Sequence, residues 1–179
     1  MSVVVKINGV DRTNVIDLSS LEVDLSLYSE PDSCVFDVMR HDPEGYVPEC
    51  GDNVEVWDGD TKIFGGIIVA ITRTMESAKL ERFSIEVKDW SEEMDRRIVF
   101  KAYENKTVEE IISDLLTNWA PGFTMNNVVC PAKINRIIFR GKPVSKCIDE
   151  LAQLVGYYWY IDPYKDVHFF AKGAEVAPF

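Results

Sequence analysis

The sequence predicts an α+β protein, with a mainly antiparallel barrel-like or sandwich β part followed by a small α/β part. Three observations predict this fold class. Short alternating stretches fill the first hundred residues, two helical apolar stripes follow, and four consecutive aromatic residues come directly after the second stripe. We expect a β-rich barrel-like domain over residues 1–100, and an α+β domain with two helices and a terminal β-hairpin over residues 101–179.

The first strands are identified by residues that alternate between apolar and polar. Residues 3–7 alternate before Asn8-Gly9, a pair that readily adopts the positive φ angles of a tight hairpin turn. In LEVDLSL, side chains alternate with period two, and the apolar face comprises Leu21, Val23, Leu25 and Leu27. Residues 34–39 repeat this pattern more weakly, and residues 41–52 have the Pro, Gly and Asp content of a loop.

The clearest hairpin lies in NVEVWDGDTKIFGGIIVAITR, residues 53–73, with its turn at residues 58–60. Gly65-Gly66 interrupts a run of β-branched residues in its second strand. Glycine inside a strand usually marks a bulge, a sharp bend or a close approach of two backbones. A phosphate-binding loop is the functional alternative, but neither glycine-rich phosphate motif follows. With LERFSIEVKDW, residues 80–90, the region holds six or seven strands.

Two helices are predicted after residue 100. Thr107 and Glu110 have the spacing of a capping box, in which each side chain satisfies a free backbone N–H. The first helix ends at Pro121-Gly122, and its apolar stripe comprises Val108, Ile111, Ile112, Leu115 and Trp119. The second helix ends near Gly156, a natural left-handed residue, and its stripe comprises Val144, Cys147, Ile148, Leu151 and either Leu154 or Val155.

The aromatic run YYWYID begins directly after Gly156. The glycine lets the chain turn back, so that one side of the new strand packs on the apolar stripe of the helix. If both faces are covered, the strand is central in its sheet or lies at a subunit contact. One face carries Tyr157, Trp159 and Ile161. The other face carries Tyr158 and Tyr160. A turn over residues 163–166 and the strand VHFFA complete a terminal hairpin.

The overall composition restricts the classes of partner. The chain has 30 acidic and 19 basic residues, a formal charge of −11, which repels a phosphate backbone, so we expect no nucleic-acid partner. No apolar run approaches the roughly 20 residues of a spanning helix, so we expect no membrane insertion. The N-terminus lacks the pattern of a secretory signal, which predicts synthesis in the cytoplasm.

One segment departs from the acidic average. It runs from Lys133 to Lys146 and also contains Arg136, Arg140 and Lys142, whereas the preceding helix carries Glu109, Glu110 and Asp114. These are either two solvated faces or complementary patches between neighbouring subunits.

The cysteines and histidines offer little for catalysis. Cys34, Cys50, Cys130 and Cys147 lie far apart without a C-x-x-C pair, so we expect reduced thiols and no metal site. Cys147 and His168 can be imagined as a thiol site, but Cys147 lies on the apolar stripe, where free cysteine behaves as a small hydrophobic residue. His168 is expected at the surface or lightly packed, and His41 lies in a loop beside Asp42.

Other polar and aromatic residues also have a structural interpretation. Glu22, Asp24 and Glu55 lie on the polar sides of strands, where carboxylates are normally solvated rather than paired for sugar hydrolysis. The segment 58–62 begins like a calcium loop but has Lys62 where a third oxygen ligand is needed. A sugar or a base can stack on tryptophan, and the chain has Trp57, Trp90, Trp119 and Trp159. Trp119 lies on a helix stripe and Trp159 on a strand face, so core packing is expected for these two. We therefore expect no catalytic, cofactor-binding or metal-binding residues, no cofactor and no enzymatic activity.

Two stretches, taken in order, resemble the baseplate hub proteins of contractile and related phage tails, the group that includes the late control protein D family. The first is C-GD-NVEV…G…KIFGGIIVAI at residues 50–71. The second is TVEEIISDLL, then INRIIFRGKPVSKCIDELAQLVGYYWYID and VHFFA, which is similar to the family's helix, short strand, glycine-ended helix and hairpin. Both are fold patterns, and together they cover most of residues 50–171.

The resemblance implies a structural role in a virion tail. Such proteins form trimeric rings at the end of the tail tube and connect the tube to a spike or lysin. It implies synthesis in the bacterial cytoplasm, self-association as a homotrimer, and contact with tube, spike and lysin proteins. Family chains are generally longer, and AKGAEVAPF at residues 171–179 looks like a linker, so an N-terminal piece of a larger tail protein is expected.

Two alternative functions remain open at this point. A carbohydrate-binding or host-adhesion module is favoured if Trp57 and tyrosines line an exposed groove. A cell-wall hydrolase is favoured if carboxylates with raised pKa values gather in a pocket.

Overall fold

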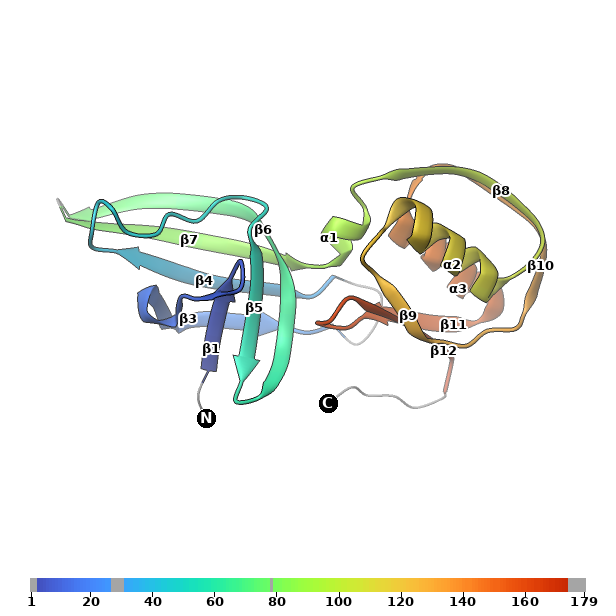
Figure 1. The fold of residues 1–179 in the computed structure, drawn as a ribbon, viewed down its shortest axis with the longest axis horizontal. Coiled ribbons are helices and arrows are strands. Elements are labelled where there is room, and N and C mark those ends of the chain that lie inside the picture. The colour runs from blue at the N-terminus through green and yellow to red at the C-terminus, as the bar shows by residue number, and fades with distance from the viewer. Residues whose placement is uncertain (1–2, 27–30, 78, 174–179) are drawn as a thin grey trace. The chain divides into compact units, whose positions relative to one another are not determined.

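The structure, a computed structural model, describes residues 3–26, 31–77 and 79–173 (Figure 1). The chain forms two compact units. The first comprises Met1–Leu25 and Pro31–Trp90, and the second comprises Ser91–Phe179 with Ser26–Glu30. The predicted α+β fold class is confirmed. The domain limits expected from the sequence, 1–100 and 101–179, stay a prediction.

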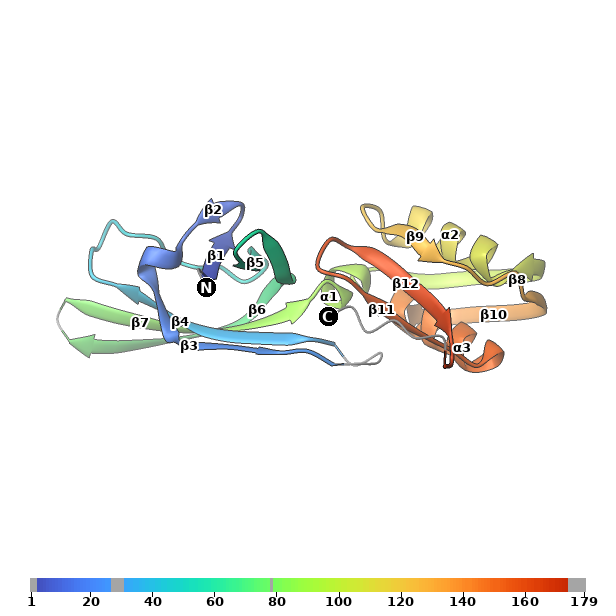
Figure 2. The ribbon, with the colours of Figure 1, turned by 90° about the horizontal axis from the view of Figure 1, so that it is seen from below.

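The first unit is built on a single curled sheet. Its strands are β1 (Val3–Ile7), β2 (Val10–Asp11), β3 (Ile16–Asp24), β4 (Ser33–Arg40), β5 (Asn53–Asp58), β6 (Thr61–Ser77) and β7 (Leu80–Asp89), with a short 3-10 turn, η1 (Thr13–Val15). The strand order is β2-β1-β5-β6-β7-β4-β3, and all neighbours are antiparallel. Figure 2 shows β3, β4 and β7 side by side at one end of this order. The sheet corresponds to the barrel-like form that the sequence predicts.

The bend predicted at Gly65-Gly66 is confirmed. β6 pairs with β5 up to Ile67 and with β7 from Gly66 onward, so the strand changes neighbours at this point. A Cβ atom on Gly66 would lie 2.0 Å from the backbone oxygen of Lys88. Only glycine permits this approach of two backbones, which lets one long strand serve both halves of the sheet.

The core of the first unit follows the predicted alternation. The fully buried side chains come from alternate positions of five strands, and they include Val5, Ile7, Cys34, Phe36, Val38, Val54, Val56, Phe64, Phe83, Ile85 and Val87. Leu21 and Val23 of β3, and Leu25 directly after it, pack against this core, whereas Leu27 lies outside the described residues. The turn at Asn8-Gly9 has φ angles of 51° and 75°, as the hairpin prediction requires.

The second unit contains three α-helices and two small sheets within its described residues. Its elements are α1 (Ser91–Met94), β8 (Ile98–Thr107), α2 (Val108–Trp119), β9 (Thr124–Val128), β10 (Lys133–Pro143), α3 (Val144–Val155), β11 (Tyr157–Ile161) and β12 (Asp166–Ala171). β8 and β10 form an antiparallel ribbon that curves around the helices in Figure 1. The other sheet has the order β11-β12-β9. α2 packs on β8 and β9, and α3 packs on β10 and β11.

Both predicted helices are confirmed, together with their ends. The hydroxyl of Thr107 accepts from the Glu110 backbone N–H at 3.2 Å, and the Glu110 carboxylate accepts from the Thr107 N–H at 2.9 Å. Gly156 ends α3 in the left-handed conformation with φ 71°. The N-terminus of α3 lacks a side-chain cap of its own, and the Asp95 carboxylate accepts instead from the backbone N–H and hydroxyl of Ser145.

One expectation for the second half requires correction, and two choices that the sequence left open are narrowed. β11 is not central: it is the edge strand, and β12 lies between it and β9. The segment after residue 133 is a strand of 11 residues rather than a short one, because it pairs along the length of β8, which the sequence pattern did not reveal. On the α3 stripe Leu154 is 60% exposed, so the last position of the stripe falls to the half-buried Val155.

Candidate interaction surfaces

The cysteine on the α3 stripe is part of the core, as the stripe predicts. Cys147 is fully buried on the same stripe as Val144, Ile148 and Leu151, and its burial raises the pKa of the thiol to about 12. Burial likewise raises the pKa of Cys34 to about 12. A thiol with such a pKa carries almost no thiolate at neutral pH, and the thiolate is the nucleophile. Neither group is arranged for nucleophilic chemistry.

His168 lies in a polar cluster on one face of the three-stranded sheet. Its ring stacks on Tyr160 at 4.5 Å, and Nδ1 lies 3.0 Å from the Tyr160 hydroxyl. Nε2 lies 3.4 Å from Asp162 Oδ2 and 3.7 Å from Asp166 Oδ2. The side chain is 18% exposed, which agrees with the lightly packed position expected for it.

Asp166 holds this cluster together by joining β12 to β9. Its carboxylate accepts from the Thr124 hydroxyl, from the Asn126 backbone N–H at 2.9 Å and from Asn127 Nδ2 at 2.8 Å. Burial opposes ionisation of Asp166, but these hydrogen bonds outweigh it and lower its pKa. An ionised carboxylate surrounded by donors is a structural anchor for the parallel β9–β12 pair.

The candidate carboxylates and the calcium-like turn belong to the first unit, whereas this cluster belongs to the second. Glu22 and Asp24 are exposed on β3, as expected, and His41 is exposed in its loop. Glu55 pairs with Lys62 at 2.6 Å, which places Lys62 across the β5–β6 hairpin rather than in a ligand set. Among the described residues no group of three or more His, Cys, Asp or Glu side chains is placed to hold a metal ion.

Two of the four tryptophans lie in the core, and the other two lie closer to the surface. Trp90 and Trp159 are buried, and Trp119 is half-buried on α2. The ring of Trp57 lies beneath the ammonium groups of Lys6, at 4.8 Å, and Lys62, at 5.3 Å. A sugar that stacked on this ring would compete with these lysines for it.

The basic segment around β10 finds acidic partners within the chain. Arg136 lies 3.5 Å from Glu104, Lys142 lies 2.5 Å from Glu150, and Lys146 lies 2.9 Å from Asp149. On α2, Glu109 accepts from the backbone N–H of Cys130. Much of the charge expected to face either solvent or a neighbouring subunit is therefore paired inside the second unit.

Unpaired strand edges are a prominent surface feature of both units. β5 accompanies β6 only as far as Ile67, so the stretch Ala70–Ser77 has a strand neighbour on one side only among the described residues. Most of this stretch is exposed, and the Met75 side chain is 59% exposed. β11 has β12 on one side and no described strand on the other. The Ala70–Ser77 edge presents free N–H and C=O groups to a partner.

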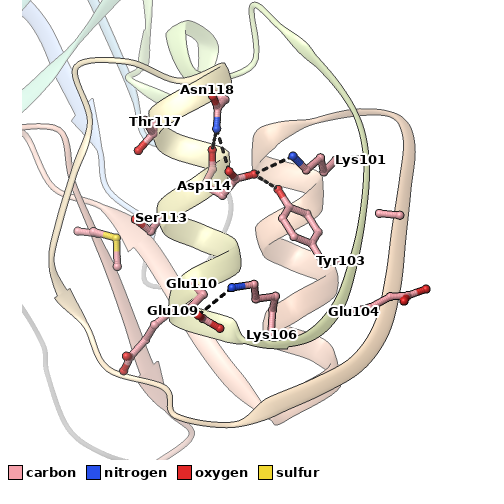
Figure 3. A pocket seen from close by; sticks show the side chains of 12 residues that line it. Lys101, Tyr103, Glu104, Lys106, Glu109, Glu110, Ser113, Asp114, Thr117 and Asn118 are labelled. Carbon is pink, nitrogen blue, oxygen red and sulfur yellow. Dashed lines mark hydrogen bonds and ion pairs between the residues drawn. The ribbon is translucent and has the colours of Figure 1, made fainter.

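A groove of about 700 Å³ lies between β8 and α2 (Figure 3). It is lined by Lys101, Ala102, Tyr103, Glu104, Lys106, Glu109, Glu110, Ser113, Asp114, Thr117, Asn118 and Met125. The Tyr103 hydroxyl donates to Asp114 Oδ2 at 2.7 Å, and the Lys101 ammonium lies 3.9 Å from the same atom. Lys106 pairs with Glu110 at 3.0 Å. Burial and the neighbouring Asp114 raise the pKa of Tyr103, so this hydroxyl remains a donor.

Sequence reasoning missed this groove because it missed β8. Of the inward positions of that strand, Val99 and Tyr103 are buried, whereas Lys101 between them is exposed. The outward Phe100 is 72% exposed, which obscures the alternation. The available signal was the cluster of β-branched and aromatic residues at 98–100.

No helix in the described ranges combines the length and apolar character needed to cross a membrane.

The fold is similar to those of several solved tail proteins. The 43 kDa tail protein of prophage MuSo2 from Shewanella oneidensis is 12% identical, with a TM-score of 0.76 over 94% of this chain and 54% of that one. A tail protein from Neisseria meningitidis MC58 is 17% identical, with a TM-score of 0.72 over 98% and 52%. The c3393 protein of E. coli, a type VI secretion component with structural similarity to T4 bacteriophage tail proteins gp27 and gp5, is 16% identical, with a TM-score of 0.67 over 95% and 49%.

These matches establish a shared fold across nearly the whole chain. The chain spans about half the length of each of these three proteins, namely 54%, 52% and 49%. No protein-family model matches the chain, and no curated protein matches it at a significant level. The fold of this chain is thus one that solved tail proteins and a type VI secretion component also have.

Proposed function

We propose that this chain is a structural, non-enzymatic component of a phage or prophage tail, acting in the baseplate hub as a ring-forming subunit that links the tail tube to a spike or lysin. The observation that carries the proposal is the fold shared with tail proteins over 94% and 98% of the chain. Because the chain spans about half of those proteins, its full set of contacts belongs to the proposal as well.

The strand edges support self-association. A row of unpaired backbone groups is a liability on a monomer, but in a symmetric ring each edge meets the next subunit and the contacts close on themselves. The stretch Ala70–Ser77 of β6 offers such an edge on the first unit. We infer a homotrimer, with the formal charge of −11 keeping free subunits apart before assembly.

The contacts of candidate side chains weigh against the two alternative functions. For carbohydrate binding, the Trp57 ring already has two lysine ammonium groups over it. For a hydrolase, two carboxylates of the β8–α2 groove, Glu110 and Asp114, are engaged in hydrogen bonds and ion pairs with neighbouring groups.

The role is tested in the strain that carries the gene. The gene is deleted, particle production is induced, and particles are counted by electron microscopy. We expect particles without complete tails, restored by the wild-type gene supplied in trans. Normal tails in the deletion strain would contradict the proposal.

Ring formation is tested separately on the purified protein by light scattering coupled to size-exclusion chromatography. We expect a mass of about three subunits of 20.4 kDa. A matched pair of variants at one position of the exposed β6 edge locates the contact. Thr74→Pro distorts the edge backbone and should lower the trimer fraction, whereas Thr74→Ala keeps the backbone N–H and should not. A stable monomer at all concentrations, for the chain with its natural flanking sequence, would contradict the ring.

A further inference from the structure

The groove between β8 and α2 borders the free edge of a strand. Consecutive residues of a strand point to opposite faces, so a hollow lined by four consecutive residues, Lys101 to Glu104, must run beside the backbone of that strand. β8 pairs with β10 on one side, and in the described part of the chain no strand pairs with it on the other. The groove therefore exposes a strand edge together with a helical wall.

The groove is preformed rather than loose. The Tyr103 ring packs edge-to-face on the buried Phe139 at 6.0 Å, and its hydroxyl bonds to Asp114 on α2. Asn118 Nδ2 donates to Asp114 Oδ1 at 2.9 Å, which holds that carboxylate in place (Figure 3). On the other side of β8, Gly141 adds one residue to β10 with φ 68°, and this bulge curves the ribbon.

The charge of the lining selects the occupant. Four carboxylates line the groove, from Glu104, Glu109, Glu110 and Asp114, against two lysines, Lys101 and Lys106. Arg136 of β10 pairs with Glu104, which still leaves the lining with a net negative charge. Tyr103, Ala102 and Met125 supply apolar surface beside them. An extended segment that entered here would place one set of alternate side chains on the apolar surface and the other toward the acidic wall of α2.

We propose that this groove binds an extended segment of a partner protein, with alternating apolar and basic side chains, as an added strand on the free edge of β8. The edge from Lys101 to Glu104 is about 10 Å long at 3.3 Å per residue, enough for a short strand, and Asn105, with φ 53°, ends its regular backbone. Backbone hydrogen bonds to β8 supply affinity, and the carboxylates of the groove supply the preference for basic side chains. The inference does not rest on the assembly role, since a monomer with this groove binds the same segment.

The test uses the isotope-labelled protein and an eight-residue capped peptide of alternating lysine and valine. Chemical shifts of backbone amides are followed by NMR during titration, and amide hydrogen exchange is measured at saturation. We expect saturable shifts over residues 101–106 and along α2, with exchange of the β8 edge amides slowed at least tenfold. A peptide of alternating glutamate and valine should bind at least about tenfold more weakly.

Two double variants separate the groove from the overall charge. S113K/T117K adds two positive charges on exposed positions of α2 within the groove, and Q153K/L154K adds two on exposed positions of α3 outside the groove lining. We expect the first to weaken binding of the lysine peptide at least about tenfold and the second less than about twofold. Circular dichroism confirms that both fold.

Three results would overturn the proposal. They are equal binding of the two peptides, shifts confined to the β6 or β11 edges, and concentration-dependent shifts over residues 101–106 without peptide, which would make a second copy of this chain the occupant.

Discussion

In the first unit one continuous sheet of seven strands carries the core, whereas in the second unit two helices pack between a two-stranded ribbon and a three-stranded sheet. The two buried polar side chains among the described residues, Ser145 and Asp166, both lie in the second unit. They bond to Asp95 and to residues of β9, which are far away in sequence. A long sheet fixes its elements through backbone register, while short elements on several layers need side-chain hydrogen bonds to fix theirs.

The largest expected effect on stability tests whether backbone pairing fixes the sheet of the first unit. Gly66→Val should destabilise the first unit by about 4 kcal/mol, near the upper end for single substitutions, because its Cβ would lie 2.0 Å from the Lys88 oxygen. Urea unfolding followed by NMR signals of each unit measures the loss. The control is Gly59→Asn, at a turn with φ 60° where an added Cβ would meet no atom within 4 Å, and it should change stability by less than about 1 kcal/mol.

The next effect tests the apolar layer of the second unit. Phe139→Ala should cost about 3–4 kcal/mol, because the side chain is 1% exposed beneath the ribbon and its removal leaves a cavity. Phe100→Ala on the paired strand is the matched control, since that ring is 72% exposed and its loss should cost less than about 1 kcal/mol. Thermal unfolding of both variants measures the difference. Equal losses would show that the ribbon does not cover the helices as described.

The polar anchor of the second unit is expected to matter somewhat less. Asp166→Asn should cost about 2 kcal/mol at pH 7, because the amide replaces one acceptor oxygen of the buried Asp166 with a donor, and the β9 donors on that side lose their acceptor. The loss should appear in the β9 and β12 amides by hydrogen exchange and leave the first unit unchanged. Asp60→Asn, on an exposed turn, is the control and should be neutral.

Lowering the pH tests the contribution of the Asp166 carboxylate to the stability of the second unit. The folded-state pKa of Asp166 is lowered, so the unfolded chain binds its proton first, at the ordinary value of about 3.9. The stability that this carboxylate contributes is present above about pH 4 and is lost as pH falls through the lowered pKa. The difference in unfolding free energy between wild type and Asp166→Asn should therefore shrink below pH 4. A difference that grows on acidification would contradict the anchor.

The smallest expected effect concerns the start of α2. Thr107→Ala removes half of the capping box and should cost about 1 kcal/mol. The first-turn amides of α2 should exchange faster, while α3 is unaffected. Thr117→Ala, at an exposed position on the same helix, should be neutral or slightly stabilising because alanine is the better helix former.

Sequence patterns predicted the strands, turns and helix ends that are determined by residues close together in the chain. The alternation in β4, β5 and β7, the turn at Asn8-Gly9 and the capping box at Thr107 were all readable, because each depends on neighbours within a few residues. The glycine at position 66 was readable as a bend, though not as the place where β6 changes partner.

What the sequence did not reveal depends on distant pairing. β8 and β10 are stabilised by each other and by the helices that their ribbon covers, so neither strand has a strong pattern alone. β9, with Asn126 and Asn127 in its middle, reads as a polar loop and becomes a strand because Asp166 of β12 binds it. The β8–α2 groove could not be predicted from the sequence for the same reason, since β8 forms one of its walls.

The parallel pairing of β9 with β12 has a consequence for biosynthesis. All strands of the first sheet have left the ribosome once β7 has emerged, so that sheet is able to fold during translation. β9, in contrast, must wait for β12, which is made after α3 and β11. At roughly 5–20 residues per second that wait is on the order of seconds. During this time the nascent second half exposes the apolar stripes of both helices. A chaperone that binds exposed apolar surface would find the largest area of it at this stage.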